Sequence, residues 1–315
     1  SSPLLFVLSV QFDALRSEGK MGVMALMSIG VTLFNMIFNY IFIALWGWGV
    51  AGSAWGTVAA QLLALVLLMG FRLRGGSKLG FSLPPRSVFV KLVKENLALG
   101  APLSLNFLSI SLVAGMVVAM LKAVDTANYE ELVGAYGIIT RLMTFSFMPL
   151  LGVSMAFQSI VGNNYGGQLP ERVNASIRVA LTIAVLYALT MEIIFITQAS
   201  AIADVFVDDA AMIAQVARIL PILVMFFFIG APINVLSGYF QAIGDAKRAA
   251  ILGLSRNYLF GLPLLLIMPR FMGELGVWVA SPVGDVLMFG LTVIVLLSMQ
   301  RTRGYRFGMF LPVKA

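Results

Sequence analysis

Five ionisable residues lie in apolar stretches long enough to form membrane-crossing helices, and they are the residues best placed to do chemistry: Arg141, Glu192, Arg218, Arg256 and Asp285. A charged side chain at the centre of a bilayer costs about 2.5–3.5 kcal/mol on insertion scales, so it is seldom kept without a role. The chain contains no Cys and no His. Thiolate and imidazole chemistry are therefore excluded, and any proton transfer must use carboxylates.

Asp285 is the carboxylate with the most informative sequence context. It follows Pro282 and Gly284 in the last predicted helix, and both of these residues weaken a helix and can expose backbone carbonyls to a polar cavity. One interpretation makes Asp285 a proton carrier. The other makes it the structural partner of Arg256 in the preceding predicted helix, and the sequence favours neither.

Arg141 and Glu192 also lie well inside predicted helices. Arg141 must face other helices or pair with an acid or a carbonyl, so it either braces the bundle or takes part in gating or substrate binding. Glu192 is expected within the hydrocarbon or at its outer edge, and whether it faces a cavity stays open. Arg218 is expected near the outer interface, where its long side chain reaches water.

The elements that must position these residues are membrane spans. Of the 315 residues, 60% are hydrophobic and 11% are charged, whereas charged residues make up about a quarter of a soluble domain. A helix needs about 20 apolar residues to cross a bilayer. Such runs predict an all-α polytopic membrane protein, in which residues 3–15 end one helix and full spans follow at about 23–45, 50–70, 97–121, 133–160, 179–200, 213–238, 249–269 and 276–298.

Basic residues are concentrated in every second segment between these spans. The positive-inside rule places such segments in the cytoplasm, and the net charge of +7 then reflects topology and contact with membrane lipids rather than nucleic-acid binding. We therefore expect a multi-pass protein of the inner (plasma) membrane. The cytoplasmic segments would be 16–20, 71–96, 163–178, 244–248 and a tail at 301–315.

The sequence also repeats itself. Residues 10–20, VQFDALRSEGK, have an echo at 238–247, GYFQAIGDAK, which aligns Phe12 with Phe240. The segment GVAGSA at 49–54 likewise aligns with GVWVAS at 276–281. Two echoes at nearly the same spacing indicate a duplicated half, as in many transporters.

The repeat predicts the domain organisation. Residues 1–70 would be the remnant of an N-terminal lobe, containing the end of its fourth helix and its fifth and sixth helices. Residues 71–96 would be a cytoplasmic linker between lobes, and 97–300 a C-terminal lobe of six helices. The same spacing implies that roughly the first three and a half helices are missing, because a whole half would begin well before residue 1.

Three segments carry a family resemblance: VGAYGIITRLMTFSFMPLLGVSMAFQSIVGNNYGG (133–167), SGYFQAIGDAKRAAILGLSRNYLFGLPLLLI (237–267) and GVWVASPVGDVL (276–287). They resemble the eighth, the tenth to eleventh and the twelfth helices of the multidrug and toxic compound extrusion (MATE) family, in its bacterial DinF/MepA-like branch. The resemblance implies a two-lobe helix bundle. It also implies a secondary active antiporter that exports amphipathic, mostly cationic compounds in exchange for H⁺ or Na⁺.

The resemblance further implies which polar residues bind substrate or couple transport to an ion. The family's sodium-coupled branch carries acidic residues in its seventh and tenth helices, where this chain has Asn106 and Asn234, so we expect H⁺ rather than Na⁺ as the coupling ion. Together with Tyr136 and Gln158, these amides would form an adaptable surface for varied compounds. Two alternatives remain open: a flippase of lipid-linked precursors from the same superfamily, and an inactive fragment.

Other function classes find no support in the sequence. There is no catalytic constellation, no metal-ligand spacing and no cofactor motif, so we expect neither an enzyme nor a cofactor protein. The segment GWGVAG at 47–52 matches a dinucleotide-binding pattern, but it joins two membrane spans and lacks the required preceding strand. We expect the full-length protein to be a monomer.

Overall fold

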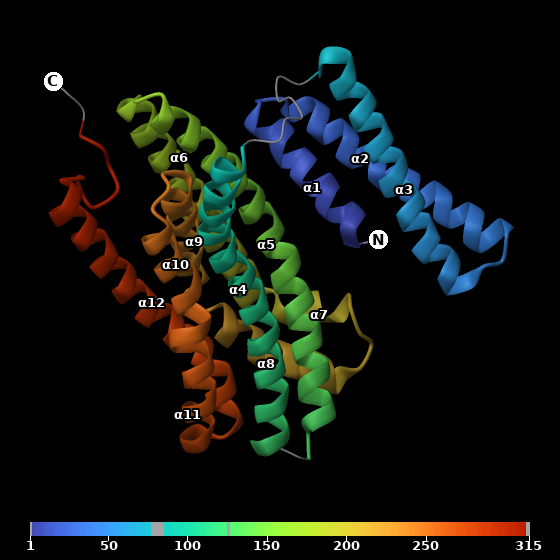
Figure 1. Ribbon diagram of the computed structural model, residues 1–315. Coiled ribbons are helices and arrows are strands. Elements are labelled where there is room, and N and C mark those ends of the chain that lie inside the picture. Colours follow the sequence, from blue (N-terminus) through green and yellow to red (C-terminus); the bar gives the residue numbers. More distant parts are fainter. Residues whose placement is uncertain (1, 77–84, 125–126, 313–315) are drawn as a thin grey trace. The chain divides into compact units, whose positions relative to one another are not determined.

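The computed structural model describes residues 2–76, 85–124 and 127–312, and it is helical nearly throughout (Figure 1). Apart from one isolated bridge between Arg306 and Phe310, these residues form helices, turns and loops. The predicted all-α class is thus confirmed. The chain divides into two compact units, Ser1–Phe89 and Val90–Ala315, and each is described by itself.

The first unit contains three helices. They are α1 (Ser2–Ser17), α2 (Met21–Asn39) with its π-helical continuation η1 (Tyr40–Leu45), and α3 (Gly49–Phe71) followed by η2 (Arg72–Gly76). At Gly56 of α3 a Cβ atom would lie 2.2 Å from Oδ1 of Asn39 on α2. Only glycine therefore allows the two backbones to approach this closely, as is common between membrane helices.

The second unit contains the remaining helices. Their bounds are α4 (Arg86–Val124), α5 (Tyr129–Gly166), α6 (Pro170–Thr197), α7 (Ala199–Asp204), α8 (Ala210–Val224), α9 (Phe227–Ala242), α10 (Ala246–Leu254), η3 (Ser255–Gly261), α11 (Leu262–Met272) and α12 (Glu274–Arg303). The π-helical η3 joins α10 and α11 into one span. The unit boundary falls inside the segment predicted as a linker, near the start of α4.

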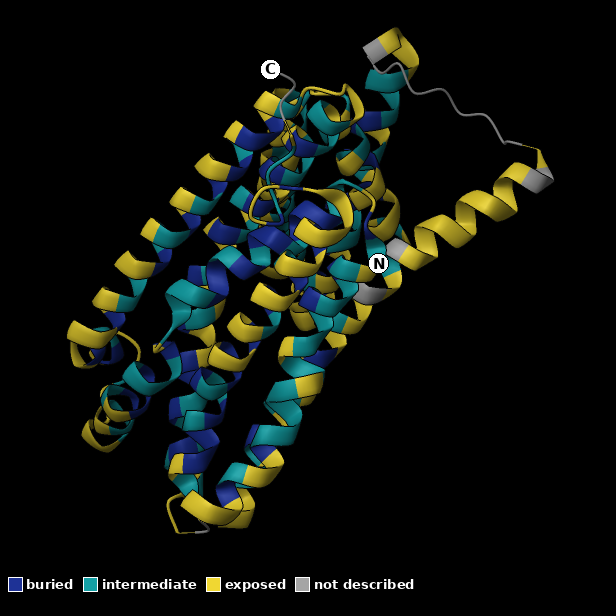
Figure 2. Ribbon diagram, turned by 90° about the vertical axis from the view of Figure 1, so that its left-hand side faces the viewer, coloured by how far each residue is buried: buried dark blue, intermediate teal, exposed yellow. Residues whose placement is uncertain are grey.

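All eight predicted spans coincide with helices of the structure. Seven described helices are long and apolar enough to cross a membrane, and the pair α8 and α9, bent by 50°, meets the same criteria when the two helices are taken together. Many residues of the second unit are exposed (Figure 2), and a large share of them are apolar, as expected for surfaces that face lipid. The chain is therefore a multi-pass membrane protein.

Two local features differ from the sequence-based expectation. The segment 71–96 was expected to be a linker, yet α4 begins at Arg86, because residues 86–97 contain no Gly or Pro to stop a helix. The apolar part of α4 is Ser104–Val124, and residues 77–84 lie outside the described residues. In addition, α12 continues unbroken through Pro282 and Gly284, both of which are buried.

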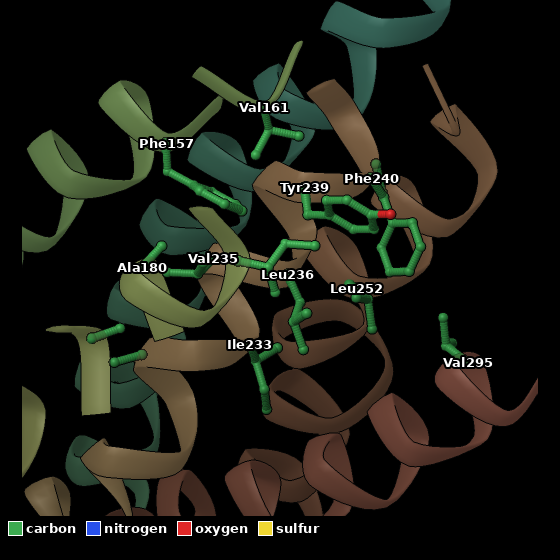
Figure 3. Packing of buried hydrophobic residues seen from close by; sticks show 14 of the residues in the cluster. Phe157, Val161, Ala180, Ile233, Val235, Leu236, Tyr239, Phe240, Leu252 and Val295 are labelled. Carbon is green, nitrogen blue, oxygen red and sulfur yellow. The ribbon is translucent and has the colours of Figure 1, made fainter. Parts of the chain in front are cut away.

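The core of the second unit consists of two clusters of buried side chains. In the first, Phe157 and Val161 of α5 pack with Tyr239 and Phe240 of α9 and with side chains of α6, α10 and α12 (Figure 3). Helix α6 contributes alanines at four-residue intervals, Ala180, Ala184 and Ala188, all buried. Small residues at this spacing let α6 and α9 approach closely. The second cluster surrounds the fully buried Trp278 of α12.

The repeated segments adopt the same turn. Gly19 after α1 and Gly244 after α9 have φ values of +75° and +76°, a conformation that glycine adopts without steric cost. In both copies the residue after the glycine donates its N–H to the carbonyl five positions earlier, at 2.9 Å and 2.8 Å, which is the Schellman arrangement of a helix end. This turn aligns Gly19 with Gly244. That alignment is shifted by three residues relative to the one that matches Phe12 with Phe240.

The described part of the tail folds back on the second unit. The side-chain amide of Asn174 on α6 donates to the carbonyl of Leu311 at 2.9 Å, and its oxygen accepts from the Leu311 N–H at 2.8 Å. The guanidinium of Arg178 lies over the ring of Phe310. Asn174 begins a formal glycosylation sequence, NAS, but it is only 8% exposed, so its role here is structural.

Candidate functional site

A groove of about 860 Å³ lies between α4 and α5 in the second unit. Its wall contains Tyr136 and Arg141, two of the residues selected from the sequence. The other lining residues are apolar or small, except for two threonines: Ala114, Gly115, Val118, Val133, Gly137, Thr140, Thr144, Phe145 and Met148. This volume lies within the range of about 300–1,000 Å³ that is typical of ligand pockets.

Arg141 is the charged residue of the groove. Within the described part of the chain it forms no ion pair and no hydrogen bond, and its side chain is exposed. The hydroxyls of Thr140 and Thr144 donate to backbone carbonyls one turn earlier, at 2.7 Å and 2.8 Å. The ring of Tyr136 lies 6.0 Å from that of Trp278. The sequence-based options for Arg141, an acid or a carbonyl as partner, are therefore not realised in the described residues.

Arg256 and Asp285 form an ion pair at membrane depth. Nε of Arg256 lies 2.7 Å from Oδ1 of Asp285, and Nη2 lies 3.2 Å from Oδ2. Such a fork-to-fork geometry is the strongest form of a charge-assisted hydrogen bond. The Asp285 side chain is 4% exposed and that of Arg256 is 44% exposed. The sequence left two interpretations of Asp285 open, a proton carrier or the partner of Arg256. The structure contains the ion pair with Arg256.

The π-helical segment η3 positions Arg256. A π-helical turn widens a helix locally and occurs frequently at functional sites. Nδ2 of Asn257 donates to Oγ of the buried Ser109 on α4 at 2.6 Å, and the Tyr258 hydroxyl donates to the Leu105 carbonyl at 3.0 Å. These contacts hold η3 against α4 and were not predicted. The sequence signal for them was the run of polar residues Arg256, Asn257 and Tyr258 inside an apolar stretch.

Glu192 binds the break in the span made of α8 and α9. Its two carboxylate oxygens accept the backbone N–H groups of Phe226, at 3.3 Å, and Phe228, at 3.0 Å. Phe226 has a φ of +71°, which is uncommon for a bulky residue. The break leaves the first N–H groups of α9 without partners in the helix, and a carboxylate there satisfies them and complements the helix dipole.

The three amide residues predicted to bind substrate do not line the groove. Asn234 donates to the carbonyl of Gly230 in its own helix at 3.1 Å, and Asn106 is half-buried on α4. Gln158 donates to Ser154 at 3.4 Å and packs on Gly238 of α9, where a Cβ would lie 2.9 Å from Nε2. The three amides therefore lie on three different helices, α4, α5 and α9, and do not form one site with the groove.

The Arg218 side chain forms an ion pair rather than only reaching for water. Its Nη2 lies 2.6 Å from Oε1 of Glu274, which also accepts the indole N–H of Trp278 at 2.6 Å. These bonds connect α8 with α12. Among the described residues, no group of three acidic side chains is arranged to hold a metal ion.

Fold and polar sites together define a class: a multi-pass, all-helical membrane protein with ionisable groups bonded at membrane depth and an open groove in its larger unit. The family model described as MatE matches residues 102–267, more than half of the chain. The chain belongs to the MatE family, so the family expected from the sequence is confirmed.

Two relatives match most of the chain. It is 26% identical over 282 residues to multidrug and toxin extrusion protein 1 of Homo sapiens, covering 88% of this chain and 48% of that protein. It is 23% identical over 281 residues to the multidrug export protein MepA of Staphylococcus saprophyticus, covering 88% and 60%. The chain thus spans about half the length of the human relative.

A solved structure shows the same fold. The outward-facing conformation of a multidrug resistance MATE family transporter of the MOP superfamily superposes with a TM-score of 0.81 at 22% identity, covering 91% of this chain and 64% of that one. At this identity the similarity establishes the fold. It confirms the predicted MATE-like architecture of helices.

Proposed function

We propose that this chain is part of a secondary active antiporter that exports amphipathic, mostly cationic compounds in exchange for H⁺, in preference to Na⁺. The observation that carries the proposal is the superposition of 91% of the chain on a multidrug transporter, within a family whose relatives are named for multidrug export. We further propose that the protein acts as a monomer in the inner (plasma) membrane.

Asp285 is the proposed coupling carboxylate of this chain. In the structure Arg256 bonds to both of its carboxylate oxygens. A proton on Asp285 removes the charge that Arg256 binds, so proton uptake and movement of η3 relative to α12 are coupled. Asn106 and Asn234 stand where the family's sodium-coupled branch carries acidic residues, and a neutral amide can neither take up a proton nor neutralise a cation. This supports H⁺ coupling through Asp285 in preference to Na⁺ coupling.

The substrate class follows from the remaining polar positions. Tyr136 lines the groove and offers an aromatic ring, which can attract a cation. Met148 lies at the groove, and methionine repacks easily around ligands of different shape. These features suit compounds that vary in shape and carry positive charge.

Transport by the full-length protein that contains this chain tests the proposal. In proteoliposomes, with ethidium as the probe, that protein should move the dye in response to an imposed pH gradient and not in response to a Na⁺ gradient. Asp285→Asn should reduce proton-driven transport at least tenfold while Arg270→Gln, at an exposed position outside the site, should not. Absence of transport under both gradients would contradict the proposed function.

A further inference from the structure

The groove between α4 and α5 combines an apolar wall with one uncompensated positive charge. Its lining contains no acidic residue, and Arg141 has neither an ion pair nor a hydrogen bond among the described residues. A guanidinium at this depth is costly unless an anion or strong acceptors compensate it. The charge and the apolar surface together fit an amphipathic anion.

The depth of Arg141 indicates where that anion must come from. Helix α5 has 38 residues and is about 57 Å long, whereas the hydrocarbon core is about 30 Å thick. Arg141 lies twelve residues from Tyr129, or about 18 Å along the helix. If the helix is centred in the bilayer, its Cα is about 5 Å inside the hydrocarbon, from where the long side chain reaches the lipid head groups.

The shape of the groove suits an acyl chain. A Cβ atom at Gly115 or at Gly137 would meet no other atom within 4 Å, so open space lies over both glycines. Phe145 and Met148 extend the apolar wall on the same face of α5 by a further one to two turns. An acyl chain can therefore lie along the groove while its head group stays at Arg141.

We propose that this groove binds an anionic phospholipid, with the phosphate at Arg141, an acyl chain against Phe145 and Met148, and the glycerol region near Gly137. The planar guanidinium matches a phosphate group through two parallel bonds. Thr140 and Thr144 use their hydroxyl protons on backbone carbonyls, so they present acceptor oxygens and leave Arg141 as the main donor. The lipid site goes beyond the proposed export function and does not depend on it.

Native mass spectrometry of the detergent-purified chain tests the lipid site without requiring transport. Dioleoyl phosphatidylglycerol and dioleoyl phosphatidylcholine have the same acyl chains and differ in head-group charge. The wild-type chain should bind the anionic lipid about tenfold more tightly. Arg141→Gln should abolish that preference and retain weak binding of both lipids, and Arg141→Lys should keep only part of it because lysine lacks the fork.

Two further variants separate the site from general effects. Gly137→Leu fills open space without removing charge, so it should weaken binding of both lipids at least threefold while the melting temperature is preserved. Arg270→Gln removes an exposed arginine that does not line the groove and should leave the preference unchanged. Equal binding of both lipids by the wild type would overturn the proposal, as would loss of the preference in Arg270→Gln to the same extent as in Arg141→Gln.

Discussion

Arg256 and Arg141 lie in membrane-crossing helices of the same unit, yet their surroundings are opposite. Arg256 is bonded to the buried carboxylate of Asp285 on another helix. Arg141 faces an apolar groove in which the described residues offer no acid. The comparison shows that an arginine at membrane depth has two uses: one is satisfied by the protein itself, and the other remains available to a ligand.

The local backbone explains part of this difference. Arg256 lies on the π-helical η3, whose neighbours Asn257 and Tyr258 are bonded to α4, so the segment that carries the guanidinium is fixed on both sides. Arg141 lies in the regular helix α5, on the same face as Gly137 and Phe145. Gly137 leaves open space beside the charge, and none of the described residues lining the groove is acidic.

The largest expected effect comes from breaking the pair. Arg256→Gln leaves the buried Asp285 without its cation, so the free energy of unfolding should fall by about 3–5 kcal/mol. Asp285→Asn leaves an arginine that is 44% exposed and should cost less, about 1–3 kcal/mol. Melting temperatures of the detergent-purified variants measure this order. The double variant should recover much of the loss, and simple additivity of the two losses would show that the residues are not a pair.

An intermediate effect is expected at Glu192, a charged residue satisfied by backbone rather than by an opposite charge. Glu192→Gln keeps one acceptor oxygen and places an NH₂ group near the second N–H, so the stability should fall by about 1–3 kcal/mol. Faster hydrogen exchange at Phe226 and Phe228 should accompany the loss. Glu130→Gln at the exposed start of α5 serves as the matched control, with a loss of a few tenths of a kcal/mol. Equal losses in both variants would mean that the contact at the break contributes nothing.

A carboxylate introduced beside Arg141 should make its surroundings resemble those of Arg256. Gly137→Glu places a carboxylate one turn before Arg141, the favourable order for an ion pair within a helix, worth about 0.2–0.5 kcal/mol. The melting temperature should change little, while the preference for phosphatidylglycerol should disappear because the new carboxylate occupies the guanidinium. Native mass spectrometry measures the preference. If it persisted, the head group would have to bind elsewhere.

The smallest expected effect is that of Arg141→Gln on stability. Because Arg141 has no bonded partner in the described residues, its removal should change the free energy of unfolding by less than about 0.5 kcal/mol. This result would contrast with the loss expected for Arg256→Gln. A loss above about 2 kcal/mol in thermal unfolding would mean that Arg141 has a structural partner after all.

The spans could be predicted from sequence because they depend on long apolar runs, whose signal is summed over about 20 residues. The pairing of Arg256 with Asp285 could be named only as one of two alternatives, since it depends on how α10, η3 and α12 pack. The role of Glu192 was not predictable. It depends on a break whose hinge is Phe226 in a left-handed conformation, and phenylalanine gives no sequence signal for that conformation.

The amides show a second limit of sequence-based prediction. Asn234 and Gln158 are polar residues in apolar helices, which favoured a ligand-binding role, yet in the structure they bond to Gly230 and Ser154 within their own helices. A polar side chain in a membrane helix can satisfy itself one turn away, and residue type alone does not distinguish that case from binding. The groove was missed for the opposite reason, since glycines and apolar residues form most of its wall.

The contact between Asn174 and Leu311 has a consequence for how freely the tail can vary. Asn174 bonds only to the backbone N–H and carbonyl of residue 311, as a neighbouring strand would, and Pro312 favours the extended backbone that presents both groups. The two hydrogen bonds therefore depend on the position of residue 311 and not on its side chain, whereas the leucine side chain adds packing against the first buried cluster. Proline at residue 311 would break the attachment because it has no N–H to donate.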